Sequence, residues 1–220
     1  AALWFLFAKQ PVSPKDAGLG ERKPGNSVIL LAGTDAGGYR TDSMMLLCVD
    51  TGEKTVSLVS IPRDTLIFCE YSVPKLNSAY GWGSGGGEGA GQLMRRVTEI
   101  IGFRPDGYLI ADLETFASLV DLFGGVDFDV PVNMYYEDAS QDLRIDIPIG
   151  QQHLSGSQAA DLMRFRSGYA DADLGRVSVQ RSFLLSAVQQ WTLAKNAAKV
   201  LPAVRLLERG TQTDLSLQNL

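Results

Sequence analysis

Short apolar runs bounded by glycine, aspartate or proline place the strongest constraint on how this chain folds. They occupy residues 28–32 (VILLA), 44–49 (MMLLCV) and 55–61 (TVSLVSI). Runs of this kind, rich in β-branched and other apolar residues, are typical of buried strands. We therefore predict that the three runs form a central β-sheet.

Apolar residues recur at helical spacing in segments that follow these runs. Residues 88–101 and 113–123 each present an apolar helical face and are followed by glycine, which commonly ends helices. A strand is predicted between them at 108–112 (YLIAD). Alternating apolar and acidic residues at 126–130 and 143–149 predict two half-exposed strands, which we expect to pair as a hairpin.

Helical periodicity dominates the rest of the chain. Helices are predicted at 157–164, 174–193 and 197–207, and a Thr/Asp/Ser cap signal at 213–220 predicts the start of a further helix. The chain has 220 residues, of which 45% are hydrophobic. These properties predict one sizeable α/β domain with a single core.

The first 26 residues differ in composition from the rest. Residues 3–8 (LWFLFA) are apolar but too few to cross a bilayer. They are either the outer end of a membrane anchor or an ordinary strand or helix. A stretch rich in proline, glycine and charge follows and is typical of a linker. We therefore predict a stub and linker at 1–26 and a folded domain at 27–220, cut short at its C-terminus.

Charge is distributed in a way that favours a local anion site. The formal net charge is −5 and no run rich in lysine or arginine is present, which argues against a nucleic-acid partner. Arginines and aspartates nevertheless gather in short clusters beside the apolar runs. The clusters indicate a dedicated site for a polyanion.

The glycine-rich segment after the first predicted strand, GTDAGGYRTD, holds two of these aspartates. It lacks both the Gly-Lys-Ser/Thr ending of a Walker A loop and the GxGxxG dinucleotide pattern. Asp35 and Asp42 are candidate ligands for Mg²⁺, a hard cation that takes oxygen ligands and bridges to phosphates. In the alternative interpretation, Asp35 caps a turn and Asp42 pairs with Arg40 on the surface.

Guanidinium groups follow in two further motifs. Arg63 comes just after a predicted strand, where its planar fork would suit a diphosphate unless it merely pairs with Asp64. In MRFRSG, alternation around Phe165 would aim Arg164 and Arg166 the same way. Residues that would share the face of the next helix are Arg176 and Gln180. A solvated basic face is the alternative for this second group.

The sequence gives little support for catalysis by a histidine base or by a serine or cysteine nucleophile. His153 is the only histidine and lies in a turn-like segment, which favours a surface or cap position over a base. Neither Cys48 nor Cys69 has an obvious base beside it, and a GxSxG motif is absent from the sequence. The two cysteines could form a disulfide or remain separate thiols, and the sequence leaves both possibilities open. Metal-assisted attack on phosphorus needs only the carboxylates and arginines present.

Six motifs in order resemble the LytR-CpsA-Psr (LCP) family over residues 27–191. They are GTDAGGYRTDSMML, VSLVSIPRDT, residues 73–86, FASLVDLFGGVDFDVP, GQQHLSGSQAADLMRFR and DLGRVSVQR. The resemblance implies an α-β-α sandwich with a mixed sheet flanked by helices. It also implies a Mg²⁺-dependent phosphotransferase that moves an anionic glycopolymer, of teichoic acid or capsular polysaccharide type, from a polyprenyl diphosphate carrier to a peptidoglycan sugar hydroxyl.

The resemblance also implies roles for individual residues. Asp35 and Asp42 would hold the metal, and the catalytic set would be Asp35, the likelier base, with Asp42 and Arg63. The diphosphate-binding set would be Arg40, Arg63, Lys75, Arg164, Arg166, Arg176 and Gln180. One departure is that Val179 occupies a position where the family often has arginine, while Arg181 follows Gln180.

The implied setting is the outer face of a bacterial cell membrane, with the catalytic domain extracytoplasmic and an N-terminal anchor that this sequence lacks. The implied partners are a polyprenyl diphosphate-linked glycopolymer and peptidoglycan. Two other functions use the same residues: a polyprenyl diphosphate hydrolase with water as acceptor, and a non-catalytic module that binds lipid-linked polymer.

Overall fold

The computed structural model describes residues 25–35, 37–69, 74–82, 87–140, 143–169, 173–192 and 194–215. These residues form two compact units: unit 1 lies within Ala1–Leu113 and Glu208–Leu220, and unit 2 is within Glu114–Leu207. Each unit has its own hydrophobic core, where the sequence predicted a single one. The predicted boundary at residue 26 stays a prediction, because residues 1–24 lie outside the described part of the chain.

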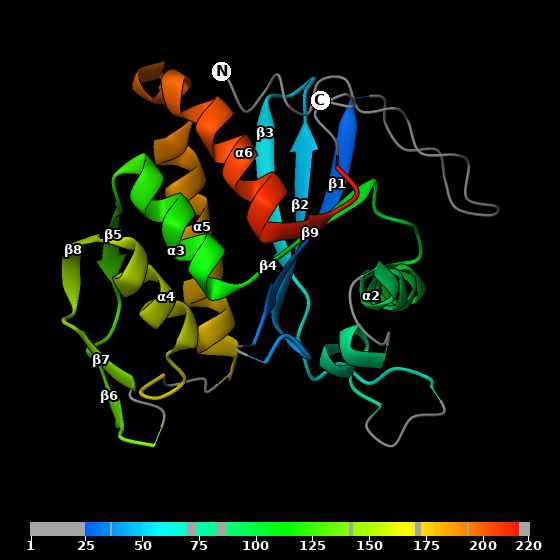
Figure 1. Cartoon of the computed structure of the whole chain (residues 1–220), viewed down its shortest axis with the longest axis horizontal. Coiled ribbons are helices and arrows are strands. Elements are labelled where there is room, and N and C mark those ends of the chain that lie inside the picture. The colour runs from blue at the N-terminus through cyan, green and yellow to red at the C-terminus, as the bar shows by residue number, and fades with distance from the viewer. Residues whose placement is uncertain are drawn as a thin grey trace. The chain divides into compact units, whose positions relative to one another are not determined.

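Unit 1 is built on a mixed five-stranded sheet in the order β3-β2-β1-β4-β9. Figure 1 draws β1, β2 and β3 as neighbouring arrows in blue and cyan. Only the β1–β4 pair is parallel, and the others are antiparallel. The strands are β1 (Asn26–Thr34), β2 (Thr41–Asp50), β3 (Thr55–Ser60), β4 (Gly107–Ala111) and β9 (Thr211–Thr213). The predicted central sheet is therefore confirmed.

Helix α2 (Gly87–Ile101) covers one face of this sheet, as the apolar spacing predicted. Leu93 and Val97 of α2 are buried against Leu30, Leu46 and Ile110 of the strands. Two short 3₁₀ helices, η1 (Leu76–Ser78) and η2 (Tyr80–Trp82), pack beside α2. Side chains of the opposite sheet face are buried as well, which explains why β1 and β2 are continuously apolar.

The C-terminal end of unit 1 differs from the prediction. Instead of starting a helix, Thr213 ends β9, which pairs antiparallel with β4. The Thr213 hydroxyl donates to the Tyr108 carbonyl at 2.6 Å, and the Asp214 carboxylate accepts from the Tyr108 amide at 2.8 Å. The edge of β4 would otherwise present unpaired backbone groups, so pairing there outweighs a weak cap signal. Residues 216–220 lie outside the described part.

Unit 2 contains helices and two two-stranded sheets, β5-β8 and β6-β7. Its elements are α3 (Leu113–Phe123), β5 (Val126–Val130), β6 (Met134–Asp138), β7 (Leu143–Ile147), β8 (Gly150–Leu154), α4 (Gly156–Arg164), α5 (Asp173–Trp191), η3 (Ala194–Lys199) and α6 (Val200–Gly210). Leu113 at the start of α3 and residues 208–210 at the end of α6 belong to unit 1. The helices lie close to where periodicity predicted them.

The predicted hairpin between 126–130 and 143–149 is wrong. β5 pairs with β8, and β7 pairs with β6. β6 and β8 were both missed, because β8 (GQQHL) is mostly polar and in β6 (MYYED) only Met134 is buried. Alternation reveals a strand but does not specify its partner, which is set by the turns and the core.

Aromatic residues organise the core of unit 2. Phe183 of α5 is fully buried and meets Phe128 of β5 edge-on, with ring centroids 5.4 Å apart. Phe116 of α3 approaches the same ring at 6.2 Å. Phe123 and Trp191 stack at 4.8 Å. The apolar faces of α3 and α5 therefore pack into the core of unit 2.

The α4 helix begins at a capping box. The Ser155 hydroxyl accepts a hydrogen bond from the Gln158 amide, and the Gln158 side chain accepts one from the Ser155 amide. Both bonds satisfy backbone donors that an isolated helix start leaves unpaired. The cap fixes the helix that ends at Arg164, one of the predicted site residues.

Cys48 and Cys69 are separate half-buried side chains against the unit 1 core, with no disulfide between them in the described residues. The apolar stub at 3–8 lies outside those residues. None of the described helices has the length and apolar character needed to span a membrane.

His153 lies on β8, where its side chain is 63% exposed, so the predicted surface position is confirmed. Its Nδ1 lies 2.7 Å from an Asp127 carboxylate oxygen on β5. This hydrogen bond raises the pKa of His153 above its usual value, slight burial opposes the rise, and the Asp127 charge and the Gly124 backbone add to it. The imidazole therefore stays charged to higher pH than a free histidine.

The pairing has a measurable pH dependence. A raised folded-state pKa means that the pair stabilises the fold fully below about pH 6.5, the unfolded value, and that this stabilisation is lost as pH rises through the folded value. Proton NMR of the single imidazole should give a pKa above about 6.5 in the wild-type chain. In Asp127→Asn it should fall back towards that value. Equal pKa values in the two proteins would contradict the pairing.

Candidate functional site

Asp35 organises a tight turn between β1 and β2. Its amide donates to the Arg40 carbonyl at 2.9 Å, and its own carbonyl accepts from Gly38 at 3.0 Å. Its carboxylate Oδ1 accepts from the amides of Tyr39 at 3.0 Å and Arg40 at 3.2 Å. Gly38 adopts a left-handed conformation with φ of 69°, which glycine tolerates best. The turn-capping interpretation of Asp35 is confirmed, and only one carboxylate oxygen is used in it.

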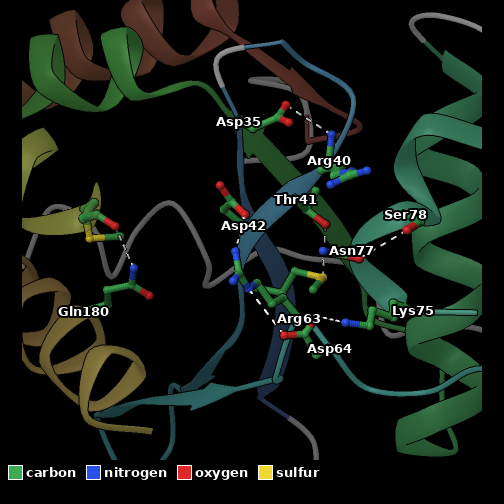
Figure 2. Close-up of polar contacts among 12 residues, drawn as sticks. Asp35, Arg40, Thr41, Asp42, Arg63, Asp64, Lys75, Asn77, Ser78 and Gln180 are labelled. Atoms are coloured by element: carbon green, nitrogen blue, oxygen red, sulfur yellow. Dashed lines mark hydrogen bonds and ion pairs between the residues drawn. The ribbon is translucent and has the colours of Figure 1, made fainter. Parts of the chain in front are cut away.

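Four charged side chains form a continuous row beside this turn. Arg63 Nη1 lies 2.7 Å from Asp42 Oδ1, and its Nε lies 3.7 Å from Asp64 Oδ2. Lys75 Nζ lies 2.9 Å from Asp64 Oδ1. Figure 2 shows the order Asp42, Arg63, Asp64, Lys75, with Arg63 between the two carboxylates. We call these four residues the charged row.

The charged row corrects one alternative drawn from the sequence. Asp42 was expected, in that alternative, to pair with Arg40, but it pairs with Arg63. Arg40 is exposed, and its guanidinium forms no ion pair with the described residues. Asp64 was expected only as a possible partner of Arg63, and its stronger contact with Lys75 was missed. Arg63 and Lys75 therefore both lie beside the Asp64 carboxylate, whose negative charge offsets part of the repulsion between the two cations.

Backbone hydrogen bonds hold the two cations of the charged row together. The Asn77 amide donates to the Arg63 carbonyl at 3.0 Å, and the Leu76 amide donates to the Thr65 carbonyl at 2.9 Å. Lys75 is the N-cap residue of η1, whose Leu76 is fully buried in the unit 1 core. The segment after β3 is thus tied to η1. Arg63 is held at the sheet edge with only 19% of its side chain exposed.

The carboxylates fit a magnesium ion by their chemistry. Asp35 directly follows β1, Asp42 is the second residue of β2, and both supply oxygen donors. Mg²⁺ is commonly held by one or two carboxylates, with waters and substrate phosphates completing its shell. Among the described residues, no group of three or more histidine, cysteine, aspartate or glutamate side chains is placed to hold a metal ion. Two carboxylates alone would leave most positions of a Mg²⁺ shell to other ligands.

Arg164 and Arg166 lie in unit 2 at the end of α4. Both are exposed, while Phe165 between them is buried as the helix C-cap. Burial therefore alternates around Phe165 as expected, while the prediction that both guanidiniums point the same way stays a prediction. Burial raises the pKa of Asp161, and the charge of Arg164 one turn later opposes the rise.

Arg176 and Gln180 are buried one turn apart on α5, each only 3% exposed. The Gln180 side-chain amide donates to the Met163 carbonyl at 2.9 Å, which joins α5 to α4. Val179 is buried in the unit 2 core, whereas Arg181 is exposed. The family often has an arginine at the position of Val179. Arg181 lies on a different, exposed side of α5, so its guanidinium does not take the place of that arginine.

The predicted residues thus form two described groups. In unit 1, the turn of Asp35 and Arg40 adjoins the charged row that contains the other three predicted residues, Asp42, Arg63 and Lys75. In unit 2, Arg164 and Arg166 flank one residue, and Arg176 and Gln180 share a helix face. The prediction that both groups bind a single diphosphate stays a prediction.

The fold and the charged groups together define an α/β protein with a carboxylate and guanidinium site at a sheet edge. A comparison with protein families matches the LytR_cpsA_psr family over residues 8–220, so the chain belongs to that family. The sequence-based recognition is confirmed.

Two curated relatives and one solved structure illustrate the similarity. The chain is 27% identical over 183 residues to the polyisoprenyl-teichoic acid–peptidoglycan teichoic acid transferase TagV of Bacillus subtilis (strain 168), covering 81% of this chain and 46% of TagV. It is 29% identical over 183 residues to the TagU transferase of the same description from Oceanobacillus iheyensis, covering 82% of this chain and 55% of TagU.

The crystal structure of B. subtilis TagV superimposes with a TM-score of 0.70 at 24% identity, over 90% of this chain and 77% of that one. The fold predicted from the sequence, a mixed sheet flanked by helices, is thereby confirmed. The chain spans about half the length of the curated relatives it matches.

Proposed function

We propose that the chain is the catalytic domain of a glycopolymer phosphotransferase. It would move an anionic glycopolymer from a polyprenyl diphosphate carrier to a sugar hydroxyl of peptidoglycan, outside the cell membrane. The observation that carries the proposal is the charged row beside the Asp35 turn, in a chain that belongs to a family with named teichoic acid transferases.

The cations of unit 1 suit the diphosphate. Arg63 is largely buried and held by Asp42, so its fork is oriented before any ligand arrives. Lys75 and the exposed Arg40 add positive charge nearby. Arginine remains charged at any physiological pH and pairs well with phosphate oxygens. For unit 2, Arg164, Arg166, Arg176 and Gln180 stay the predicted diphosphate-binding residues.

Asp35 is proposed as the general base. Its Oδ1 is used in the turn, and its other carboxylate oxygen accepts no hydrogen bond from the described residues. That oxygen is available to take the proton of the acceptor hydroxyl. The acceptor oxygen then bonds to the phosphorus that carries the glycopolymer. The bond from that phosphorus to the bridging oxygen breaks, and polyprenyl monophosphate leaves.

Asp35 and Asp42 would hold the Mg²⁺ proposed for this reaction. The bound ion would supply positive charge to neutralise the phosphate oxygens as they develop charge. Arg63 would orient Asp42 for that role through their 2.7 Å contact.

A product analysis tests the proposed function. The chain is incubated with a polyprenyl diphosphate-linked teichoic acid precursor, with and without purified peptidoglycan, and the products are identified by mass spectrometry. We expect phosphodiester-linked polymer on peptidoglycan together with polyprenyl monophosphate, and loss of both on chelation with EDTA that Mg²⁺ reverses.

Three outcomes would overturn this proposal or a part of it. Equal turnover without peptidoglycan would identify a hydrolase. Lipid-linked polymer that is bound but never converted would identify a binding module. Full transfer in EDTA would remove Mg²⁺ from the proposal and leave the transfer itself standing.

A further inference from the structure

Tyr169 lies in the segment between α4 and α5 of unit 2, in sequence between Arg166 and Arg176. Its ring packs edge-on against Phe165, with centroids 5.5 Å apart and an interplanar angle of 77°. A Cβ atom added to Gly175 would come within 2.7 Å of the Tyr169 Cβ. The first turn of α5 therefore closes directly onto this tyrosine, which holds the ring in place from two sides.

The Tyr169 hydroxyl is buried and forms no hydrogen bond with the described residues. A buried polar group without a partner costs roughly 1–3 kcal/mol. Such groups are few in folded proteins and commonly mark a place where a water, an ion or a ligand belongs. By contrast, the half-buried Tyr80 hydroxyl in unit 1 donates to Gln212 at 2.8 Å.

The hydroxyl stays a donor at physiological pH. Burial raises the pKa of Tyr169 to about 12, although the positive charge of Arg176 opposes the rise. A neutral O–H can approach an anion without adding negative charge to the site. Arg176 directly follows Gly175, whose added Cβ would meet the Tyr169 Cβ at 2.7 Å, so the guanidinium and the phenol belong to neighbouring residues at the start of α5.

The neighbouring groups determine what ligand suits this hydroxyl. Arg176 is buried and carries a full positive charge, and Arg164 and Arg166 flank the phenylalanine on which Tyr169 packs. An acceptor with negative charge is favoured here over a neutral one. A phosphate oxygen supplies both the negative charge and the lone pairs that the O–H and the guanidinium require.

We infer that the Tyr169 hydroxyl donates a hydrogen bond to a phosphate oxygen of the anion that Arg176 binds. Tyr169 is thereby a further binding residue for the diphosphate headgroup. This inference rests on the proposed function, because it assigns the residue to the same substrate. Phe165 and Gly175 act through Tyr169 by fixing its ring.

Tyr169→Phe tests this assignment, since it removes one oxygen and keeps the ring packing. Binding of inorganic pyrophosphate to the whole chain is measured by titration calorimetry in the presence of Mg²⁺. We expect affinity to fall roughly tenfold or more, the range for a hydrogen bond to a charged group. The melting temperature should stay equal or rise, because a buried hydroxyl without a partner has been removed.

Tyr135→Phe is the matched control. Tyr135 is exposed on β6, its hydroxyl already bonds to Glu137 at 3.1 Å, and pyrophosphate affinity should not change. An unchanged affinity in Tyr169→Phe would overturn the inference, as would a wild-type chain that does not bind pyrophosphate. If the wild-type chain transfers polymer and Tyr169→Phe binds normally, only the inference fails. If pyrophosphate binding depends on Tyr169 but no transfer occurs, only the proposed function fails.

Discussion

Arg63→Ala is expected to lower the rate of polymer transfer by roughly a hundredfold or more while the protein stays folded. Removing one preorganised donor that stabilises transition-state charge costs enzymes a factor of this size. Arg63 is the central cation of the charged row, 2.7 Å from Asp42 and 3.7 Å from Asp64. Its loss would remove a diphosphate donor and also release Asp42 from its orientation. The transfer rate is measured with the lipid-linked precursor and peptidoglycan.

Arg96→Ala provides the matched control for this substitution. Arg96 lies on α2, is 15% exposed against 19% for Arg63, and pairs with Glu99 at 2.8 Å. Its removal therefore breaks an ion pair of similar length and burial outside the proposed site. Transfer by Arg96→Ala should match the wild type. Equal rates in Arg63→Ala and Arg96→Ala would show that the charged row has no part in transfer.

The local sequence pattern was sufficient to predict β1 and β2 because both faces of these two strands are largely buried. Residues 28–32 and 44–49 are apolar at nearly every position, and they lie within β1 and β2. The sequences of the unit 2 strands give a weaker signal for where the strands lie and how they pair. β8 has a single fully buried residue, Leu154, and its partner β5 lies beyond an intervening pair of strands. Partner choice depends on packing that no local window contains.

The pairing of Asp42 with Arg63 shows what the sequence lacked at the site. Met45 of β2 is opposite Ser60 of β3. Continuing that antiparallel register by three residues brings Asp42 opposite Arg63, 21 positions apart in the chain. The residue types were recognisable from the motifs, but the contact follows from strand register. The contact of Lys75 with Asp64 similarly depends on hydrogen bonds between the segment after β3 and η1.

Helical periodicity was sufficient to predict that Arg176 and Gln180 lie together, unlike the contacts that depend on strand register. Spacing of one turn predicted a common face, and both are buried. Tyr169 could not be found in this way, because it lies outside any periodic element. Its significance depends on the burial of one oxygen atom and on the close approach of Gly175.

Gly156→Ala is expected to destabilise the protein by roughly 1–3 kcal/mol, the usual cost of forcing extra atoms into a packed interior. Gly156 is the first residue of α4 and lies against α3. An added Cβ would come to 2.1 Å from the Ala117 carbonyl oxygen and 2.6 Å from Asp121 Oδ2. The Gly156 amide also donates to Asp121 Oδ1 at 2.6 Å, so a shift of α4 would strain this bond.

The direction of the stability change in Gly156→Ala distinguishes steric overlap, which would destabilise the protein, from helix propensity, which would stabilise it. Alanine favours helices over glycine by about 1 kcal/mol, so propensity alone would stabilise the variant. Gly91→Ala in α2 serves as the comparison, because a Cβ there meets no atom within 4 Å. Thermal unfolding should show a lower melting temperature for Gly156→Ala and an equal or higher one for Gly91→Ala. A Gly156→Ala protein as stable as Gly91→Ala would mean that α3 and α4 separate at little cost, and the close approach at Gly156 would not be a constraint on the fold of unit 2.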